Sequence, residues 1–268
     1  MRSLIVIPAR YHSTRFPGKP LQDIAGHTLL SRVISIARQV CAENDAISYV
    51  IATDHEDIKR HAADLGANAV MTDPGLPSGS DRVLAAAEAY DGEIDFILNL
   101  QGDAPFTPPG YITALIEAIQ NTDCDVVTPI VPLSWEDLDI VRRQKQHTPF
   151  SGTSCVFRDD GEAMWFSKQI LPAIRKEDQL RSKSPLSPVW RHIGLYGYRL
   201  DALRKFVALP TGHYENLEGL EQLRFLENGM RIKAVRVTSS RNAMWGVDTP
   251  EDAAHARELI ELHGDPFV

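Results

Sequence analysis

The chain has 268 residues, 43% of them hydrophobic, which is enough for one large α/β domain or for two closely packed lobes. Its formal net charge of −8 argues against a nucleic-acid partner, because proteins that bind phosphate backbones usually carry an excess of Lys and Arg. The three cysteines form no Cys-x-x-Cys pair, and no stretch approaches the roughly 20 apolar residues of a membrane span, so we expect a cytoplasmic protein without zinc site, disulfide framework or membrane insertion.

The first part of the chain alternates short apolar runs with longer amphipathic segments. We predict strands at 3–8, 47–53 and 95–101, and helices at 28–40, 55–66 and 81–91. This order indicates parallel strands joined by crossover helices, and the nearly continuous apolar character of the strands is typical of a sheet covered on both faces. The sequence therefore predicts an α/β fold.

Polar loops follow three of the predicted strands. They are "PARYHSTRFPGK" (8–19), "TDHED" (53–57) and "QGDAP" (101–105). Ligands of open α/β sheets bind beyond the carboxyl ends of the strands, so we expect these loops to share one edge and to form the site.

The pattern loosens from about residue 123. We predict strands at 125–133, 153–159, 162–167, 191–199 and 231–237. Helices are predicted at 214–229, where Gly229 provides a C-terminal stop, and at 249–264. The charged, proline-containing segment 175–188 is predicted to be a mobile surface loop.

The loop after the first strand gathers three cations, Arg10, Arg15 and Lys19. Such a loop suits phosphate, because backbone N–H groups and a helix N-terminus add to the side-chain charge. Neither a GxxxxGK[ST] nor a GxGxxG motif is present, so this would be a different kind of nucleotide loop. The alternative is a solvated turn with scattered salt bridges, and charge spacing alone does not decide between the two.

Two aspartates supply a possible counterpart to the cations. Asp103 follows a predicted buried strand and Asp248 precedes the last predicted helix. Carboxylates with substrate phosphates are typical ligands of Mg²⁺. Taken singly, Asp103 could be a turn residue, and Asp248 could belong to a helix N-cap, alone or with Thr249. In combination with the basic loop, the pair favours a metal and phosphate site.

Seven segments, in order, resemble one family. They are "IPARYHSTRFPGKPL", "VIATDHEDI", "SGSDR", "NLQGDAP", "RHIGLYGYR", "LEQLR" and "GVDTPEDA". Together they are similar to the 3-deoxy-manno-octulosonate (Kdo) cytidylyltransferases. The resemblance implies a single domain with the three-layer, Rossmann-like fold of nucleotide-diphospho-sugar transferases, a predominantly parallel mixed sheet, a smaller dimerisation lobe and a homodimer. It implies a nucleotide-binding half at about 1–122, a sugar-binding and dimerisation part at about 123–240, and a metal-site loop and helix at about 241–268.

The resemblance also implies a Mg²⁺-dependent reaction in which CTP and Kdo, or a derivative such as 8-amino-Kdo, give the CMP-sugar and pyrophosphate for lipopolysaccharide or capsule synthesis. It implies catalytic roles for Lys19, Arg10, Asp103 and Asp248, the two aspartates as metal ligands. The nucleotide-binding positions it implies are Pro8, Ala9, Arg10, Arg15, Lys19, Ser78, Ser80, Arg82 and Gln101. The sugar-binding positions it implies are Lys168, Arg175, His192, Tyr196, Glu221 and Gln222.

Two positions depart from the family pattern. Ala104 stands where a glutamate is usual, and Lys168 stands where an arginine is usual. Lys lacks the planar guanidinium that binds a carboxylate through two parallel hydrogen bonds. Three alternatives therefore remain open at this point: another acidic sugar such as a nonulosonic acid, a different nucleotide, or a catalytically inactive nucleotide-binding paralogue with a regulatory role.

Overall fold

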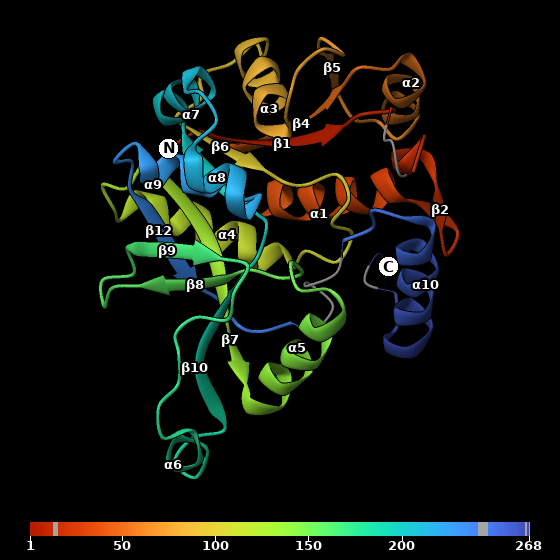
Figure 1. Cartoon of the computed structure of the whole chain (residues 1–268). Helices are drawn as coiled ribbons and strands as arrows, with labels where there is room; N and C mark the ends of the chain where they lie inside the picture. The colour runs from red at the N-terminus through yellow and green to blue at the C-terminus, as the bar shows by residue number, and fades with distance from the viewer. Residues whose placement is uncertain (13–15, 241–245, 266, 268) are drawn as a thin grey trace. The chain divides into compact units, whose positions relative to one another are not determined.

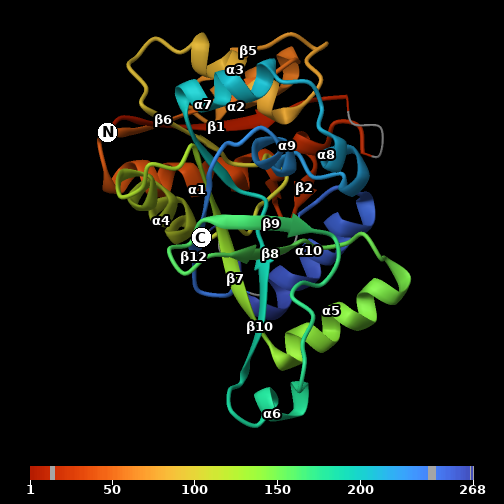
Figure 2. The ribbon, with the colours of Figure 1, turned by 60° about the vertical axis from the view of Figure 1, so that its left-hand side comes forward.

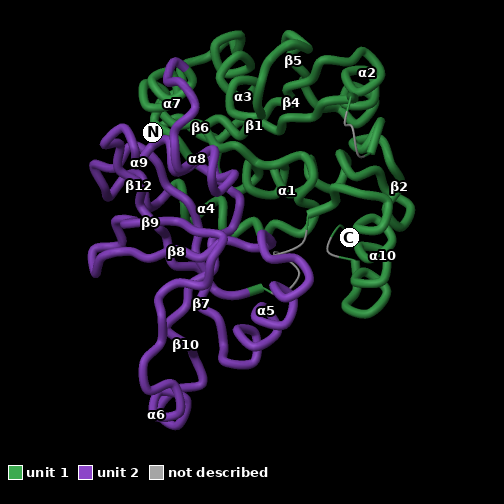
Figure 3. The backbone as a smooth tube through the Cα atoms, viewed as in Figure 1, with its two compact units in different colours: residues 1–116, 197–207, 240–268 green, residues 117–196, 208–239 purple. Residues whose placement is uncertain are grey.

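A computed structural model describes residues 1–12, 16–240, 246–265 and 267. The chain divides into two compact units (Figure 3). Unit 1 contains Met1–Ile116, Gly197–Val207 and Ser240–Val268, and unit 2 contains Glu117–Tyr196 and Ala208–Ser239. The C-terminal segment that was expected to carry a metal ligand thus belongs to the same unit as the basic loop. None of the helices in the described ranges is long and apolar enough to cross a membrane.

Unit 1 is built on parallel strands in the order β5-β4-β1-β6. Their bounds are β5 Ala69–Met71, β4 Ile47–Thr53, β1 Ser3–Ala9 and β6 Phe96–Asn99. β1 is the central strand, paired in parallel with both β4 and β6, and the side chains from Leu4 to Ile7 are at most 1% exposed. β11 (Tyr196–Arg199), whose residues 197–199 belong to this unit, follows β6 in the strand order. The predicted parallel α/β fold is confirmed.

Helices cover both faces of this sheet, as its apolar strands require. In Figure 1, α2 (Glu56–Asp64) and α3 (Gly79–Glu88) lie on one side of β1 and β4, and α1 (Leu29–Glu43) lies on the other. The Thr28 side chain caps α1 by accepting a hydrogen bond from the Ser31 N–H at 3.1 Å. The unit also contains the short helix η1 (Lys19–Leu21), the hairpin of β2 (Asp23–Ile24) and β3 (His27–Thr28), the start of α4 (Pro109–Gln120), most of α7 (Leu200–Ala208), and α10 (Pro250–His263).

Unit 2 has mixed strand directions. β7 (Val126–Ser134) pairs in parallel with β12 (Ile232–Arg236) and antiparallel with β10 (Leu186–His192). β10 pairs antiparallel with β8 (Ser154–Phe157), which forms a hairpin with β9 (Ala163–Ser167), as can be followed in Figure 2. The helices are α5 (Trp135–His147), α6 (Glu177–Arg181), α8 (His213–Glu218) and α9 (Gln222–Glu227). α5 packs its buried Trp135 and Leu138 against Leu133 and Val189 of the sheet.

Two predicted elements are each divided in the structure. The strand predicted at 191–199 is two strands, because the chain turns at Ile193–Leu195, where the Leu195 N–H donates to the Ile193 carbonyl at 2.7 Å. The helix predicted at 214–229 is two helices, since Gly219 adopts a left-handed φ of 63° that ends α8. Gly229, with φ 70°, stands beyond the end of α9 as expected.

The segment 175–188 is not simply a loop. It contains α6, which is tied to α5 by ion pairs: Arg142 to Glu177 at 2.7 Å and Arg181 to Asp139 at 2.7 Å. Hydrogen bonds from Arg142 and from Arg181 to the Glu177 carboxylate lower the pKa of Glu177 to about 2. The high charge of this segment, which suggested mobility, is what attaches it to α5. Several elements were not predicted: β5, α4, α5, α7 and the β2–β3 hairpin.

Candidate active site

A lysine of the basic loop lies between two aspartates in unit 1. Lys19 Nζ donates to Asp103 Oδ2 at 2.8 Å and to Asp248 Oδ1 at 3.0 Å. The lysine side chain is only 13% exposed, whereas those of Asp103 and Asp248 are 32% and 46% exposed. Three residues from distant parts of the chain therefore meet at one point, with both carboxylates reachable from solvent.

Close backbone packing places Asp103 at the end of β6. The preceding Gly102 lies against the end of β1, where a Cβ atom would come within 2.3 Å of the Pro8 carbonyl oxygen. The Asp103 carbonyl in turn accepts a hydrogen bond from the Val247 N–H at 2.8 Å. Only glycine fits at 102, because any larger residue would push the Asp103 loop away from β1.

Asp248 is not the N-cap of the last helix. Thr249 takes that role. Its hydroxyl accepts from the Asp252 N–H at 3.2 Å, and the Asp252 carboxylate accepts from the Thr249 N–H at 2.9 Å. The same Asp252 carboxylate accepts from the Asp248 N–H at 3.0 Å. The cap therefore holds the Asp248 backbone and leaves its carboxylate to meet Lys19.

The rest of the basic loop is partly described. Arg10 is exposed at the end of β1 and forms no ion pair within the described ranges, while Arg15 lies outside the described residues. The neighbouring Tyr11 stacks on His55 with ring centroids 3.9 Å apart, and its N–H donates to Asp54 Oδ1 at 3.0 Å. The loops after β1 and β4 are thus joined, and with Asp103 after β6 this confirms the shared edge.

Asp54 also holds a buried arginine. Arg82, of the "SGSDR" segment, forms an ion pair with Asp54 Oδ2 at 3.1 Å, and both side chains are only 4% exposed. A second guanidinium nitrogen donates to the Thr72 hydroxyl. Arg82 therefore connects α3 to the loops after β4 and β5, and a direct contact with nucleotide stays a prediction. Sequence reasoning gave Asp54 no role, although its place just after a strand is the same signal that identified Asp103.

The remaining predicted nucleotide positions surround this edge. Ser78 is the N-cap of α3 and accepts from the Ser80 N–H at 3.1 Å, and Ser80 is buried. Pro8 and Ala9 end β1, and Gln101 lies partly buried beyond β6. Ala104, the departure from the family pattern, closes a turn in which its N–H donates to the Gln101 carbonyl at 3.1 Å.

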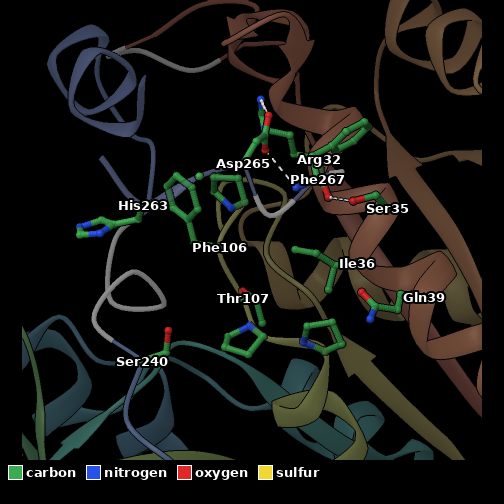
Figure 4. Close-up of a pocket in the computed structure, with 14 residues that line it drawn as sticks. Arg32, Ser35, Ile36, Gln39, Phe106, Thr107, Ser240, His263, Asp265 and Phe267 are labelled. Atoms are coloured by element: carbon green, nitrogen blue, oxygen red, sulfur yellow. Dashed lines mark hydrogen bonds and ion pairs between the residues drawn. The ribbon is translucent and has the colours of Figure 1, made fainter. Parts of the chain in front are cut away.

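A pocket of about 420 Å³ lies beside the same loop, lined by Pro105–Pro109, α1 and the C-terminal tail (Figure 4). The buried arginine of this pocket, Arg32, is fully engaged. Arg32, 2% exposed, donates to the Ile24 carbonyl at 2.8 Å and to the Asp265 carboxylate at 2.6 Å. Arg32 thus serves to attach the tail to α1, and it offers no charge for a phosphate.

Unit 2 contains the predicted sugar-side residues, with His192 at the end of β10. His192 is buried, and its Nε2 lies 2.8 Å from the Thr128 hydroxyl oxygen. Thr128 donates its own hydroxyl hydrogen to the Leu195 carbonyl at 2.8 Å. The Thr128 oxygen can therefore only accept from His192, so His192 Nε2 carries a proton and donates it to this hydrogen bond. Burial is the largest cause of a lowered pKa at His192, and the charges of Lys168 and Arg191 add to it, so the pKa is about 3. The ring is neutral, and the Tyr196 ring centroid lies 5.4 Å away.

The other sugar-side positions differ in exposure. Lys168 is partly buried just after β9, and its N–H donates to Glu218 Oε2 at 2.7 Å. Arg175 and Glu221 are exposed. Gln222 is 2% exposed, and its Nε2 has no hydrogen-bond partner in the part of the chain that the structure describes. A buried amide donor without a partner is a natural contact for a bound hydroxyl group.

Sequence reasoning missed three charged residues near Lys168. They are Lys145 on α5, Arg191 on β10 and Glu218 at the end of α8. Arg191 precedes His192 in a motif that was recognised, but strand spacing does not reveal which side chains lack partners. In the described ranges, no group of three or more His, Cys, Asp or Glu side chains could hold a metal ion.

Comparisons with known proteins agree on one family. A sequence model of the cytidylyltransferases matches residues 4–232. The 3-deoxy-manno-octulosonate cytidylyltransferase of Maricaulis maris is 41% identical over 266 residues, covering 99% of each chain. That of Bacteroides thetaiotaomicron is 35% identical and covers 97% of this chain and 99% of its own.

Two solved structures are similar in fold. A CMP:2-keto-3-deoxy-manno-octonic acid synthetase in complex with CTP has a TM-score of 0.83 at 30% identity, covering 98% of this chain and 99% of its own. A cytidylyltransferase of Leptospira borgpetersenii, 16% identical with a TM-score of 0.60, covers 100% of this chain and 91% of its own and is similar in fold.

Proposed function

Because the chain belongs to the 3-deoxy-manno-octulosonate cytidylyltransferase family, we propose that it transfers CMP from CTP to Kdo and releases pyrophosphate. The product would supply an activated acidic sugar for lipopolysaccharide or capsule synthesis. The observation that carries the proposal for this chain is the Lys19 ammonium group held between Asp103 and Asp248 at the strand-end edge of unit 1. An inactive paralogue would have no need to keep this arrangement, which brings together three distant parts of the chain.

The two aspartates fit a divalent cation. Their carboxylate oxygens converge on one positive group, both side chains are partly exposed, and oxygen is the ligand that hard cations prefer. A site with only two protein carboxylates is typical of Mg²⁺, which is completed by water and substrate phosphates. Bound there, the cation would polarise the α-phosphoryl group and favour ionisation of the attacking hydroxyl.

The protein's own groups would bind and orient the triphosphate. Arg10 is exposed beside the site and would bind phosphate oxygens, and Lys19 would stabilise the negative charge that develops on the departing pyrophosphate. Arg15 would contribute similarly. Pro8, Ala9, Ser78, Ser80 and Gln101 would line the nucleotide, with Arg82 holding the α3 loop through Asp54. The sugar's anomeric hydroxyl would attack in line with the leaving group, so positioning provides much of the rate.

The acceptor would be bound by unit 2. Gln222 Nε2 is a buried donor for which the described part of the chain supplies no partner, and Lys168 supplies positive charge. His192, neutral and fixed by Thr128, would bind a sugar hydroxyl through Nδ1 as an acceptor. Tyr196, Glu221 and Arg175 complete the proposed set. Acceptance of the 8-amino form of Kdo, a homodimeric assembly and a cytoplasmic location are further parts of this proposal.

The experiment is a panel of substrates with purified protein. CTP, Mg²⁺ and Kdo should release pyrophosphate, whereas ATP, GTP and UTP should be poor donors. The 8-amino form of Kdo and a nonulosonic acid, tested in parallel, identify the preferred acceptor. Turnover of another acid without turnover of Kdo would contradict the proposed acceptor.

Variants test the site itself. Asp103→Asn and Asp248→Asn should each lower the rate of pyrophosphate release about 100-fold or more. Asp64→Asn removes an exposed carboxylate of α2 and is the matched control, with an expected rate equal to wild type. Near-normal rates for either site variant would show that the metal ligands are wrongly assigned.

A further inference from the structure

Three cations of unit 2 lie around one turn. Lys145 Nζ donates to the carbonyl oxygens of Pro149 at 3.3 Å and of Ser151, and to the carbonyl of Lys168 at 2.6 Å. The next residue in the turn, Gly152, lies against Arg191, whose guanidinium carbon would be 3.8 Å from a Cβ atom at 152. Lys145, Lys168 and Arg191 therefore gather beside residues 149–152.

Their positive charge is not balanced. The carboxylate whose charge acts on both Lys145 and Lys168 is that of Glu218, and its two oxygens already accept from the Ser167 hydroxyl at 2.8 Å and the Lys168 N–H at 2.7 Å. In the described ranges, neither the Lys168 ammonium nor the Arg191 guanidinium forms a hydrogen bond or an ion pair. Among the residues that the structure describes, two partly buried cations thus lack partners, in a protein whose net charge is −8.

This arrangement costs stability in the free protein. Burial lowers the pKa of Arg191. Burial also lowers the pKa of Lys168, where the charge of Glu218 opposes the shift and the charge of Arg191 adds to it. A charge taken out of water without a partner is unfavourable, and like charges add to the cost. An anion between the cations would offset both effects.

We propose that Arg191, with Lys168, binds the carboxylate of the acidic sugar, and this rests on the proposed function. The planar guanidinium of Arg191 provides the paired hydrogen bonds that Lys168 cannot provide at its position. Lys145 orders the turn and adds positive charge. Neutral His192 contributes no charge to this carboxylate site, so discrimination for an acid depends on the cations.

The test compares Arg191→Gln with Arg143→Gln, an exposed arginine on the same helix as Lys145. Arg191→Gln should raise the KM for Kdo about 10- to 100-fold, with the KM for CTP and kcat near wild type, because one charge-assisted contact is lost. Arg143→Gln should leave both constants unchanged, and Arg191→Lys should recover part of the loss.

A second readout does not depend on turnover. The Tm of free Arg191→Gln should equal or exceed that of wild type, since an unpaired cation is removed. Kdo alone should raise the Tm of wild type but not that of Arg191→Gln. An unchanged KM for Kdo in Arg191→Gln would overturn the proposal. A lower Tm of this variant together with an equal rise in the KM for Kdo and the KM for CTP would also overturn it. If wild type released no pyrophosphate, the proposed function would be contradicted. The Kdo-dependent Tm shifts of Arg191→Gln and Arg143→Gln would still decide the role of Arg191.

Discussion

At the scale of single residues, neighbouring groups hold each site residue in place and leave one of its polar groups available to a ligand. Thr128 fixes the protonated nitrogen of His192, and the cap formed by Thr249 and Asp252 fixes the backbone of Asp248. Sequence motifs identified His192 and Asp248, because their neighbours match a family pattern. Thr249 was already a candidate cap in the sequence, whereas Thr128 escaped notice, because it is far from His192 in the chain and only folding brings the two together.

His192 should make stability depend on pH. Its folded pKa is about 3 against an ordinary value of 6.5, so the unfolded chain binds the proton more readily and the neutral ring stabilises the fold above pH 6.5. As the pH falls from 6.5 toward 3, that contribution is lost. Between about pH 7 and about pH 5 the loss should be about 2 kcal/mol.

Urea unfolding of wild type and His192→Gln measures this loss. The variant should lose distinctly less free energy of unfolding over the same pH range, which lies above the range in which paired carboxylates such as Glu177 take up protons. Equal losses in the two proteins would mean that His192 is charged in the folded state.

At the scale of elements, the alternation of strands and helices in unit 1 could be predicted, because fully buried parallel strands have continuous apolar sequences. The shared edge of the three loops followed from that topology. The hydrogen bond from Tyr11 to Asp54 and the close approach of Gly102 to Pro8 confirm it. The short elements could not be predicted. α8 and α9 have one helical pattern, and only the left-handed backbone at Gly219 separates them. α6 depends on ion pairs with α5, a contact between segments far apart in the chain.

The junction of β6 and β1 leads to a prediction about Gly102. Gly102→Ala would place a methyl group against the Pro8 carbonyl and should lower the free energy of unfolding by about 1–3 kcal/mol. Because Asp103 follows directly, activity should fall further than stability alone explains.

Gly110→Ala is the matched control, measured by urea unfolding and pyrophosphate release. Gly110 lies in α4 with no atom within 4 Å of an added Cβ, so this variant should be as stable as wild type or slightly more stable. Equal stability of the two variants would show that the approach of Gly102 to Pro8 is not needed.

At the scale of the whole molecule, the chain divides the proposed work between its units. The proposed nucleotide and metal positions with described structure belong to unit 1, and the proposed sugar positions belong to unit 2. The sequence indicated this division only by family resemblance, since the C-terminal segment 240–268 returns to unit 1 after unit 2 is complete.

Binding of the two substrates should therefore be separable. Gln222→Leu should raise the KM for Kdo about 10-fold by removing a buried donor, and it should leave the CTP-induced rise in Tm intact. Lys19→Ala should lose the CTP-induced rise. A loss of CTP binding in Gln222→Leu would contradict the division.

The most direct test of the central claim follows the phosphorus of CTP labelled at its α-phosphate. With Kdo and Mg²⁺ present, the label should move into a CMP-sugar, and unlabelled pyrophosphate should appear in equal amount. Asp103→Asn and Asp248→Asn should leave the label in CTP. Label that stays in CTP with wild type, or that appears in CMP without sugar, would contradict the account.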